Sequence, residues 1–299
     1  MKTYKQLLNE WAKNTELLHE MTDAERHGVQ QRLLEMYADI RSVCKQHNLT
    51  IVLGGGSCLG AIRHKGIIPW DDDLDLNMPR KDYNRLLELL KQNVLGDKYE
   101  YRYPDGKMYS TSAFLKIYLK DTIFESVFNE SAQYSKGLYI DIFPIEGVPN
   151  FKPWRIIKGL IANSLRLIGN CVYESQYDMK TLKQMMGDYP ELLSFIRKRR
   201  LIGKLFSFLD SRTWMCLFDR LVADERVTPL VTVPTGRNLY HGEIIESSKL
   251  FPAIEVPFEN MTADVYHDYH AYLTMMYGDY MKIPPVEKRE RHFIKNIKL

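Results

Sequence analysis

Apolar residues recur every three to four positions over long stretches of the chain, which is the spacing of amphipathic helices. The clearest stripe ends near position 44 and consists of Leu33, Leu34, Tyr37, Ile40 and Val43. Thr22 and Glu25 have the spacing of a capping box, so this helix is expected to begin there and to stop at Asn48. An earlier stripe between Leu7 and Leu18 predicts another helix before it.

Other segments alternate apolar and polar side chains or are rich in β-branched residues, and both patterns are typical of strands. These segments are residues 50–53, 73–78, 113–119, 138–144, 230–233 and 253–258. Helical spacing returns over residues 80–95, 154–167 and 192–209, and again from Thr262 onward. Together these elements predict an α+β fold with a mixed sheet.

The balance of strands and helices divides the chain into three parts. Residues 1–150 combine N-terminal helices with a strand-rich core, residues 151–227 form a helical insertion, and residues 228–299 are the C-terminal part of the same domain. The insertion contains a basic run, Arg197–Arg200. A solvated helix face explains this run, and the alternative is a peripheral contact with an anionic membrane or a polyanionic acceptor.

Composition narrows the class of protein. With 45% hydrophobic and 26% charged residues in 299 positions, the chain has the make-up of a globular protein, and its net charge of +3 is too weak to predict nucleic-acid binding. No apolar run reaches the roughly twenty residues of a transmembrane segment. No signal-peptide pattern is present, so we expect a cytoplasmic protein, free or at the inner face of the membrane, with reduced thiols at Cys44, Cys58, Cys171 and Cys216.

A glycine run at Gly54–Gly56 follows the short strand at 50–53 and precedes a short helical pattern. Ser57 is expected to be the N-cap of that helix. A strand, a glycine turn and a helix N-terminus form an anion-binding arrangement, because the backbone N–H groups can approach a phosphate. A plain tight turn is the alternative, but the aspartates that follow within twenty residues favour the anion site.

Four aspartates stand at positions 71, 72, 73 and 75. Asp73 and Asp75 alternate with leucines and therefore share one strand face, which Asp71 joins if the strand starts early, while Asp72 points away. Adjacent carboxylates repel unless a cation lies between them, and Mg²⁺ binds to such oxygens together with substrate phosphates. A solvated acidic turn is the alternative, and the apolar alternation argues against it. An EF-hand is excluded because Leu76 stands where its glycine is required and Asp82 where it normally has glutamate. A P-loop is excluded because the glycines are not followed by its Gly-Lys-Ser/Thr motif.

Two further charged residues interrupt apolar strands. Lys116 needs a partner or water at its tip, and one explanation is an edge-strand lysine that limits aggregation. Asp141 lies on one strand face with Tyr139 and Phe143, and an unpaired buried carboxylate is costly, so a cation or several donors are expected beside it. The alternative for Asp141 is a structural role at the turn of Pro144.

The run from residue 56 to residue 75 reads GSCLGAIRHKGIIPWDDDLD and resembles the signature of the LicD family. That family includes bacterial phosphocholine transferases and fukutin-type ribitol-phosphate transferases, and it has a nucleotidyltransferase fold similar to that of DNA polymerase β. Ser57 and Cys58 replace the usual threonine and leucine of the family, and serine keeps the hydroxyl. Similar segments at Asp141–Pro144 and Tyr277–Met281 extend the resemblance along the chain, and it is weakest in the helical middle.

The resemblance implies a Mg²⁺- or Mn²⁺-dependent transferase that moves a phospho-alcohol group from a CDP-alcohol to a hydroxyl of a glycan or lipid-linked glycan, such as lipopolysaccharide or teichoic acid. Asp73, Asp75 and Asp141 would hold the metal and align the acceptor for in-line attack. The donor phosphates would be contacted by Gly55, Gly56, Ser57, Arg63, His64 and Lys116. Nucleotidyl transfer from an NTP and a non-catalytic binding module are the alternatives, and the complete set of acid positions argues against the second.

Four tyrosines near the C-terminal end also have helical spacing, and they are Tyr269, Tyr272, Tyr277 and Tyr280. Packing of a helix against the core explains this spacing. The alternative is an aromatic rim for a ligand, including a quaternary ammonium group.

Overall fold

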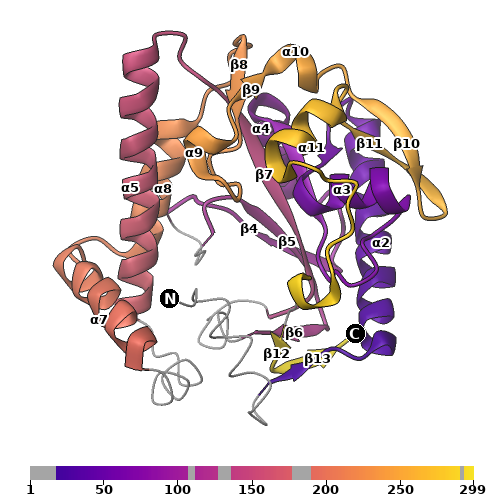
Figure 1. Ribbon diagram of the computed structural model, residues 1–299, viewed down its shortest axis with the longest axis horizontal. Coiled ribbons are helices and arrows are strands. Elements are labelled where there is room, and N and C mark those ends of the chain that lie inside the picture. The colour runs from indigo at the N-terminus through magenta and orange to yellow at the C-terminus, as the bar shows by residue number, and fades with distance from the viewer. Residues whose placement is uncertain (1–17, 107–111, 127–135, 177–189, 290–292) are drawn as a thin grey trace.

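The structure is a computed structural model that describes residues 18–106, 112–126, 136–176, 190–289 and 293–299. Helices pack against a central mixed sheet, so the expected α+β class is confirmed (Figure 1). The helix expected between Leu7 and Leu18 lies outside the described residues.

The central sheet brings together strands that are far apart in the sequence. Its main path runs in the order β2 (Val52–Leu53), β3 (Asp75–Pro79), β7 (Tyr139–Gly147), β5 (Leu115–Leu119) and β4 (Tyr99–Arg102). β3 and β7 are parallel, and the other pairs on this path are antiparallel. The end of β7 also pairs with β8 (Leu230–Thr232), which in turn pairs with β9 (Ile245–Glu246).

In the described part of the chain, three small antiparallel pairs lie outside this sheet. They are β1 (His19–Glu20) with β12 (Phe293–Ile294), β6 (Ile123–Glu125) with β13 (Asn296–Lys298), and β10 (Ile254–Phe258) with β11 (Met261–Val265). The helix expected from Thr262 onward is therefore wrong. Glu259, with a φ of 51°, turns the chain back at this point, and Thr262 pairs with Pro257 in the hairpin. Helix α11 (Tyr269–Tyr277) begins later, where the Asp268 side chain accepts a hydrogen bond from the Ala271 N–H.

The long N-terminal helix α2 (Asp23–Gln46) forms as expected. Thr22 and Glu25 make a capping box, and the predicted apolar stripe is buried. Helices α3 (Gly55–His64) and α4 (Arg80–Lys91) follow β2 and β3 along the chain. Both of these helices pack against β3, and α2 and α4 pack against β7, so apolar side chains from sheet and helices form one core.

The middle of the chain forms a group of helices at one side of the sheet, on the left in Figure 1. The group consists of α5 (Lys152–Gln176), α7 (Pro190–Leu205) and α8 (Ser211–Val222). Arg80 joins this group to the sheet: its buried guanidinium contacts the carboxylate of Glu146 at the end of β7 and lies 2.7 Å from that of Asp219 in α8. Arg80 is buried and bridges these elements, so its role is structural.

Short elements complete the fold around the C-terminal half. They are α9 (Leu239–Gly242), α10 (Ser247–Leu250) and the 3₁₀ turn η1 (Val286–Lys288). Across the part of the chain that the structure describes, no helix combines the length and the apolar character needed to cross a bilayer.

Candidate functional site

The glycine run forms the start of α3. Gly54 occupies the N-cap position, so the prediction that Ser57 caps the helix is wrong. Gly55 has a φ of +45°, a left-handed conformation that glycine adopts at little cost, and this allows the helix to be capped three residues earlier than expected. A Cβ at Gly55 or Gly56 would stand 3.6 Å from a carboxylate oxygen of Asp75 or 3.4 Å from one of Asp71, respectively. These two carboxylates therefore lie close to the N-terminus of the helix.

Hydrogen bonds fix this helix start against β3 and α11. The Ser57 hydroxyl accepts a hydrogen bond from the Asp75 N–H at 2.8 Å, and the Gly54 N–H donates to the Asp75 carbonyl at 2.9 Å. The Gly55 N–H donates to the Tyr272 hydroxyl at 2.9 Å. Ser57 thus supports the backbone that carries Asp75, and its predicted phosphate contact stays a prediction.

The aspartates alternate as predicted, although β3 begins only at Asp75. Asp71, Asp73 and Asp75 line one pocket, whereas Asp72 is buried away from its lining. Burial and the nearby carboxylates of Asp71 and Asp75 raise the pKa of Asp73 well above its ordinary value, because each disfavours a further negative charge. The cluster is therefore short of positive charge.

Asp141 lies beside this cluster through strand pairing. In the parallel pair of β3 and β7, Asp75 is opposite Asp141, and in the antiparallel pair of β5 and β7, Lys116 is opposite Asp141. Neighbouring strands lie about 4.8 Å apart, so the three side chains form one row across the sheet. The Lys116 ammonium contacts both oxygens of Asp141, at 2.5 and 2.8 Å, and lies 3.7 Å from the ring centroid of Tyr139.

This pairing changes the interpretation of Lys116. Its strand, β5, lies between β7 and β4, so the edge-strand explanation is wrong. Burial raises the pKa of Asp141, and the Lys116 ammonium opposes that rise. Lys116 and Asp141 lie just outside the pocket lining, as neighbours of the acid cluster. The phosphate contact proposed for Lys116 and the metal contact proposed for Asp141 stay predictions.

The carboxylates suit a metal ion that is shared with a substrate. Among the described residues, no three histidine, cysteine, aspartate or glutamate side chains are grouped so that they alone would hold a metal ion. Asp73 and Asp75 both reach the pocket, and Mg²⁺ in phosphate-transfer sites is commonly held by one or two carboxylates plus substrate phosphates. A cation would also relieve the repulsion that raises the pKa of Asp73. The donor set therefore fits Mg²⁺ that completes its coordination with substrate oxygens.

The pocket has a volume of about 980 Å³ and is bordered by elements from the whole chain. Its walls include α3, β3, α5, α11, the loop after β8 and the C-terminal segment around η1. Among the described residues, its basic lining side chains are Arg63, Arg166, Arg237, Lys282, Lys288 and Arg289. Of these only Arg63 was predicted as a site residue, and the fold brings the others to the pocket from distant parts of the chain.

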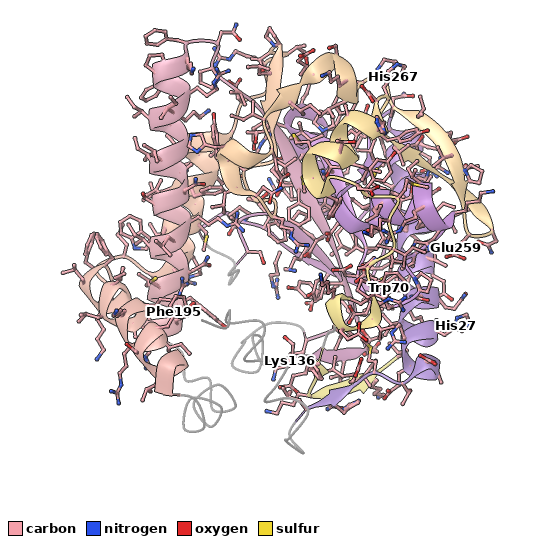
Figure 2. The ribbon with its side chains drawn as sticks, viewed as in Figure 1. His27, Trp70, Lys136, Phe195, Glu259 and His267 are labelled. Atoms are coloured by element: carbon pink, nitrogen blue, oxygen red, sulfur yellow. The ribbon has the colours of Figure 1, made fainter. Side chains whose placement is uncertain are left out.

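Arg63 and His64 take different positions. Arg63 lines the pocket, donates to the Tyr280 carbonyl at 2.9 Å and donates to His64 Nε2 at 2.9 Å. His64 lies outside the lining, packed edge-on against Trp70, and burial together with the charge of Arg63 lowers its pKa. Figure 2 shows Trp70 beside the C-terminal segment, where the Arg289 guanidinium lies 4.1 Å from its ring centroid. In this arrangement His64 supports Trp70 and Arg63.

The tyrosine spacing is explained largely by packing, as expected. Tyr272 is buried, with its ring 4.3 Å from that of Tyr266, and Tyr280 packs on His270. Tyr272, Tyr277 and Tyr280 nevertheless all contribute to the pocket lining. Packing and a ligand rim are therefore compatible for these side chains.

Comparisons with known proteins agree with this site. The family model described as "LicD/FKTN/FKRP, nucleotidyltransferase domain" matches residues 48–158, which include the glycine run and all the aspartates of the cluster. The chain is 27% identical over 256 residues to the lipopolysaccharide cholinephosphotransferase LicD of Haemophilus influenzae, covering 85% of this chain and 90% of that protein. An uncharacterised protein of Rickettsia prowazekii is 37% identical over 60 residues, which is 20% of this chain and 23% of that protein. The LicD resemblance is therefore confirmed: residues 48–158 match the LicD/FKTN/FKRP family model, and most of the chain is similar to a LicD protein.

Proposed function

We propose that this protein is a Mg²⁺-dependent transferase that moves a phospho-alcohol group, phosphocholine foremost, from a CDP-alcohol to a hydroxyl of a lipopolysaccharide-like glycan. The observation that carries the proposal is the cluster of three carboxylates, Asp71, Asp73 and Asp75, beside the N-terminus of α3. These carboxylates line a pocket that basic side chains surround. The similarity to a named cholinephosphotransferase over 85% of the chain supports the same reaction class. We assign the core to the nucleotidyltransferase fold, supported by the family description and by the parallel pairing of Asp75 with Asp141.

The residues of the pocket divide the work of phosphate transfer. The N-terminus of α3, apart from the Gly55 N–H that binds Tyr272, and the arginines and lysines of the wall bind the donor diphosphate, because helix N-termini and cations attract anions. Ser57 holds the backbone of Asp75, and Lys116 holds Asp141, so both carboxylates have fixed positions. Asp73 and Asp75 would hold Mg²⁺, or Mn²⁺, which when bound neutralises charge on the transferring phosphate.

The reaction conserves atoms without a further reactant. The acceptor hydroxyl oxygen forms a new bond to the phosphorus that carries the alcohol, and the bond from that phosphorus to the CMP oxygen breaks. The hydroxyl proton passes to an aspartate carboxylate of the pocket. The products are a phosphodiester on the glycan and CMP.

A donor panel tests this proposal. Purified protein with Mg²⁺ and a glycan acceptor is expected to release CMP from CDP-choline, and EDTA is expected to stop the release. Release of pyrophosphate from an NTP would instead support nucleotidyl transfer, and binding without any product would support a non-catalytic module. Either of those results, with no CMP formed, would overturn the phosphotransferase assignment.

We also propose that the helical insertion brings the enzyme to a membrane that displays a lipid-linked acceptor. The outer face of α5 exposes Trp154, Ile156, Ile157, Leu160, Ile161 and Leu167, and α7 exposes Phe195, Leu201, Ile202 and Leu205 (Figure 2 labels Phe195). Arg197, Lys198 and Lys204 are exposed on α7 among these apolar side chains. An apolar face mixed with cations matches an anionic lipid surface, which offers both acyl chains and negative headgroups.

A further inference from the structure

A buried carboxylate occupies the pocket wall away from the aspartate row. Glu243 follows α9, has only 3% of its surface exposed and contributes to the pocket lining. The Asn238 N–H donates to its carboxylate at 2.9 Å. A Cβ at Gly236 would collide with the same carboxylate, so the loop 236–238 wraps closely around it. The position of Glu243 is therefore well defined.

The helical insertion supports this wall from the outside. Arg166 of α5 donates from Nη1 to the carbonyl oxygens of Pro234 and Gly236, at 3.2 and 3.3 Å. Its positive charge faces Glu243, but this nitrogen is directed at the carbonyl groups of the loop. Arg166 is thus a positioning residue that fixes the loop, and it balances the charge of Glu243 only in part.

The negative charge of Glu243 is only partly balanced by its neighbours. Burial raises the pKa of Glu243 to about 7, although the Asn238 N–H and the charge of Arg166 both oppose the rise. A buried carboxylate is stabilised when a cation completes its environment. Since the wall faces the pocket, a positively charged ligand can supply that cation.

Tyr272 lies within the electrostatic influence of Glu243 and also contacts the glycine run at the start of α3. Tyr272 lines the pocket near Glu243, whose charge contributes to raising its pKa, and the Tyr272 hydroxyl accepts the hydrogen bond from Gly55. Tyr277 and Met276 of the same helix line the pocket as well. A carboxylate combined with aromatic and thioether side chains is suited to a quaternary ammonium group, which is both apolar and charged.

We infer that Glu243 recognises a positively charged head group, a trimethylammonium or ammonium, on the alcohol that this enzyme transfers. This inference rests on the proposed function, and it names the class of donor. A neutral polyol such as glycerol or ribitol would leave the buried carboxylate without a cation, whereas choline would provide one. Glu243 is thus a specificity-determining residue, separate from the aspartates that face the phosphates.

Calorimetry on the full chain without acceptor tests the inference, with CDP-choline, CDP-glycerol and CMP as probes. At pH 8 the unmodified protein is expected to bind CDP-choline about tenfold or more tightly than CDP-glycerol, since one charged contact distinguishes the two. Glu243→Gln, which keeps the shape and removes the charge, is expected to bring this ratio close to one. CMP affinity should stay within about twofold, because CMP lacks the head group.

Glu246→Gln is the matched control, since Glu246 is exposed on β9 and lies outside the pocket lining. It is expected to keep the full preference for CDP-choline. An unmodified protein that binds both CDP-alcohols equally, or a Glu243→Gln protein that keeps the preference, would overturn the inference while leaving the transferase proposal intact. If neither CDP-alcohol binds, the proposed function and the inference both fail.

The pH dependence gives a second readout. As pH falls from 8 to 6 through the pKa of about 7, Glu243 takes up a proton and the preference for CDP-choline is expected to shrink. The charged and titratable groups around Glu243 include Arg166 of α5, Arg237 of the loop whose backbone N–H also bonds to Glu243, Tyr266 after β11 and Tyr272 of α11. Burial raises the pKa of both tyrosines, so they stay neutral in this range. Changes at the aspartates affect both donors and cancel in the ratio, so a constant ratio between pH 8 and 6 would contradict the inference.

Discussion

Asp73 shares the pocket wall with Asp71 and Asp75, and its environment shows how a residue's neighbours change its chemistry. Its pKa is raised by burial and then by these neighbours, so the folded protein binds a proton at Asp73 more tightly than the unfolded chain does. The contribution of Asp73 to stability is therefore best at low pH and is lost as pH rises through the folded-state pKa. At neutral pH the metal-free protein is therefore destabilised by Asp73, a loss of stability that is common at functional sites.

Asp73→Asn is expected to remove this destabilisation together with the transferase activity. In EDTA at pH 7 the variant should melt a few degrees higher than the unmodified protein, at roughly 2–4 °C for each kcal/mol regained. CMP release should fall by about two orders of magnitude or more, because the amide no longer attracts Mg²⁺. Thermal melts and the CMP assay measure the two effects, and Asp121→Asn, at an exposed turn position, serves as the control. A lower melting temperature combined with retained turnover would contradict this role.

At the scale of secondary-structure elements, pairing and burial connect segments that the sequence keeps apart. Strand β7 lies between β3 and β5, and this alone places Asp141 next to both Asp75 and Lys116. At its other end, β7 carries Glu146, which is fully buried and meets Arg80 from the start of α4. Arg80 also binds Asp219 of α8, so one guanidinium connects the sheet, α4 and the insertion.

Replacement of Arg80 by methionine is expected to destabilise the fold strongly. Glu146 would remain buried without its cation, and removal of one partner of a buried ion pair costs about 3–5 kcal/mol. Denaturant unfolding measures this loss. The double variant Arg80→Met with Glu146→Leu should recover part of the stability, because it removes the unpaired charge as well. Equal stability of the single variant and the unmodified protein would show that the ion pairs of Arg80 with Glu146 and Asp219 do not hold the insertion in place.

At the scale of the whole molecule, the pocket and the exposed apolar face lie on different parts of one structure. The pocket borders the sheet, α3 and α11, while the face belongs to α5 and α7, which stand together on the left in Figure 1. Arg166 links the two, since it extends from α5 to the loop of the pocket wall. A membrane contact at the insertion would therefore bring the pocket wall close to lipid-linked acceptors.

Vesicle sedimentation tests this membrane contact. The protein is expected to sediment with vesicles that contain phosphatidylglycerol and much less with phosphatidylcholine alone, and added salt should weaken the binding. The double variant Trp154→Ser with Leu160→Ser should reduce the bound fraction several-fold, because both side chains are exposed on α5. Val227→Ser removes an apolar side chain that is 99% exposed outside these helices, and it should bind as the unmodified protein does. Equal binding to both kinds of vesicle, or unchanged binding of the double variant, would exclude an anionic membrane as the partner of this face.

The sequence by itself determined the features that depend on near neighbours. The helix stripe before position 44, the capping box at Thr22, the strand around Asp141 and the alternation of Asp73 with Leu74 all follow from spacing within a few residues. Backbone geometry imposes these periods locally, so the pattern survives in the fold. The motif between residues 56 and 75 was also recognisable because its glycines and aspartates lie within one short segment.

Only the tertiary structure decided which of these segments meet. Thr262 lies in a strand because it pairs with Pro257, Lys116 binds Asp141 because their strands are neighbours, and Glu243 reaches the pocket because Arg166 holds its loop. The Thr262 strand depends on pairing within a hairpin, whereas the contacts of Lys116 and Arg166 depend on burial and on groups contributed by residues distant in the chain. The free energies of burial and charge pairing are set by the three-dimensional surroundings, and a local pattern of residue types does not contain them.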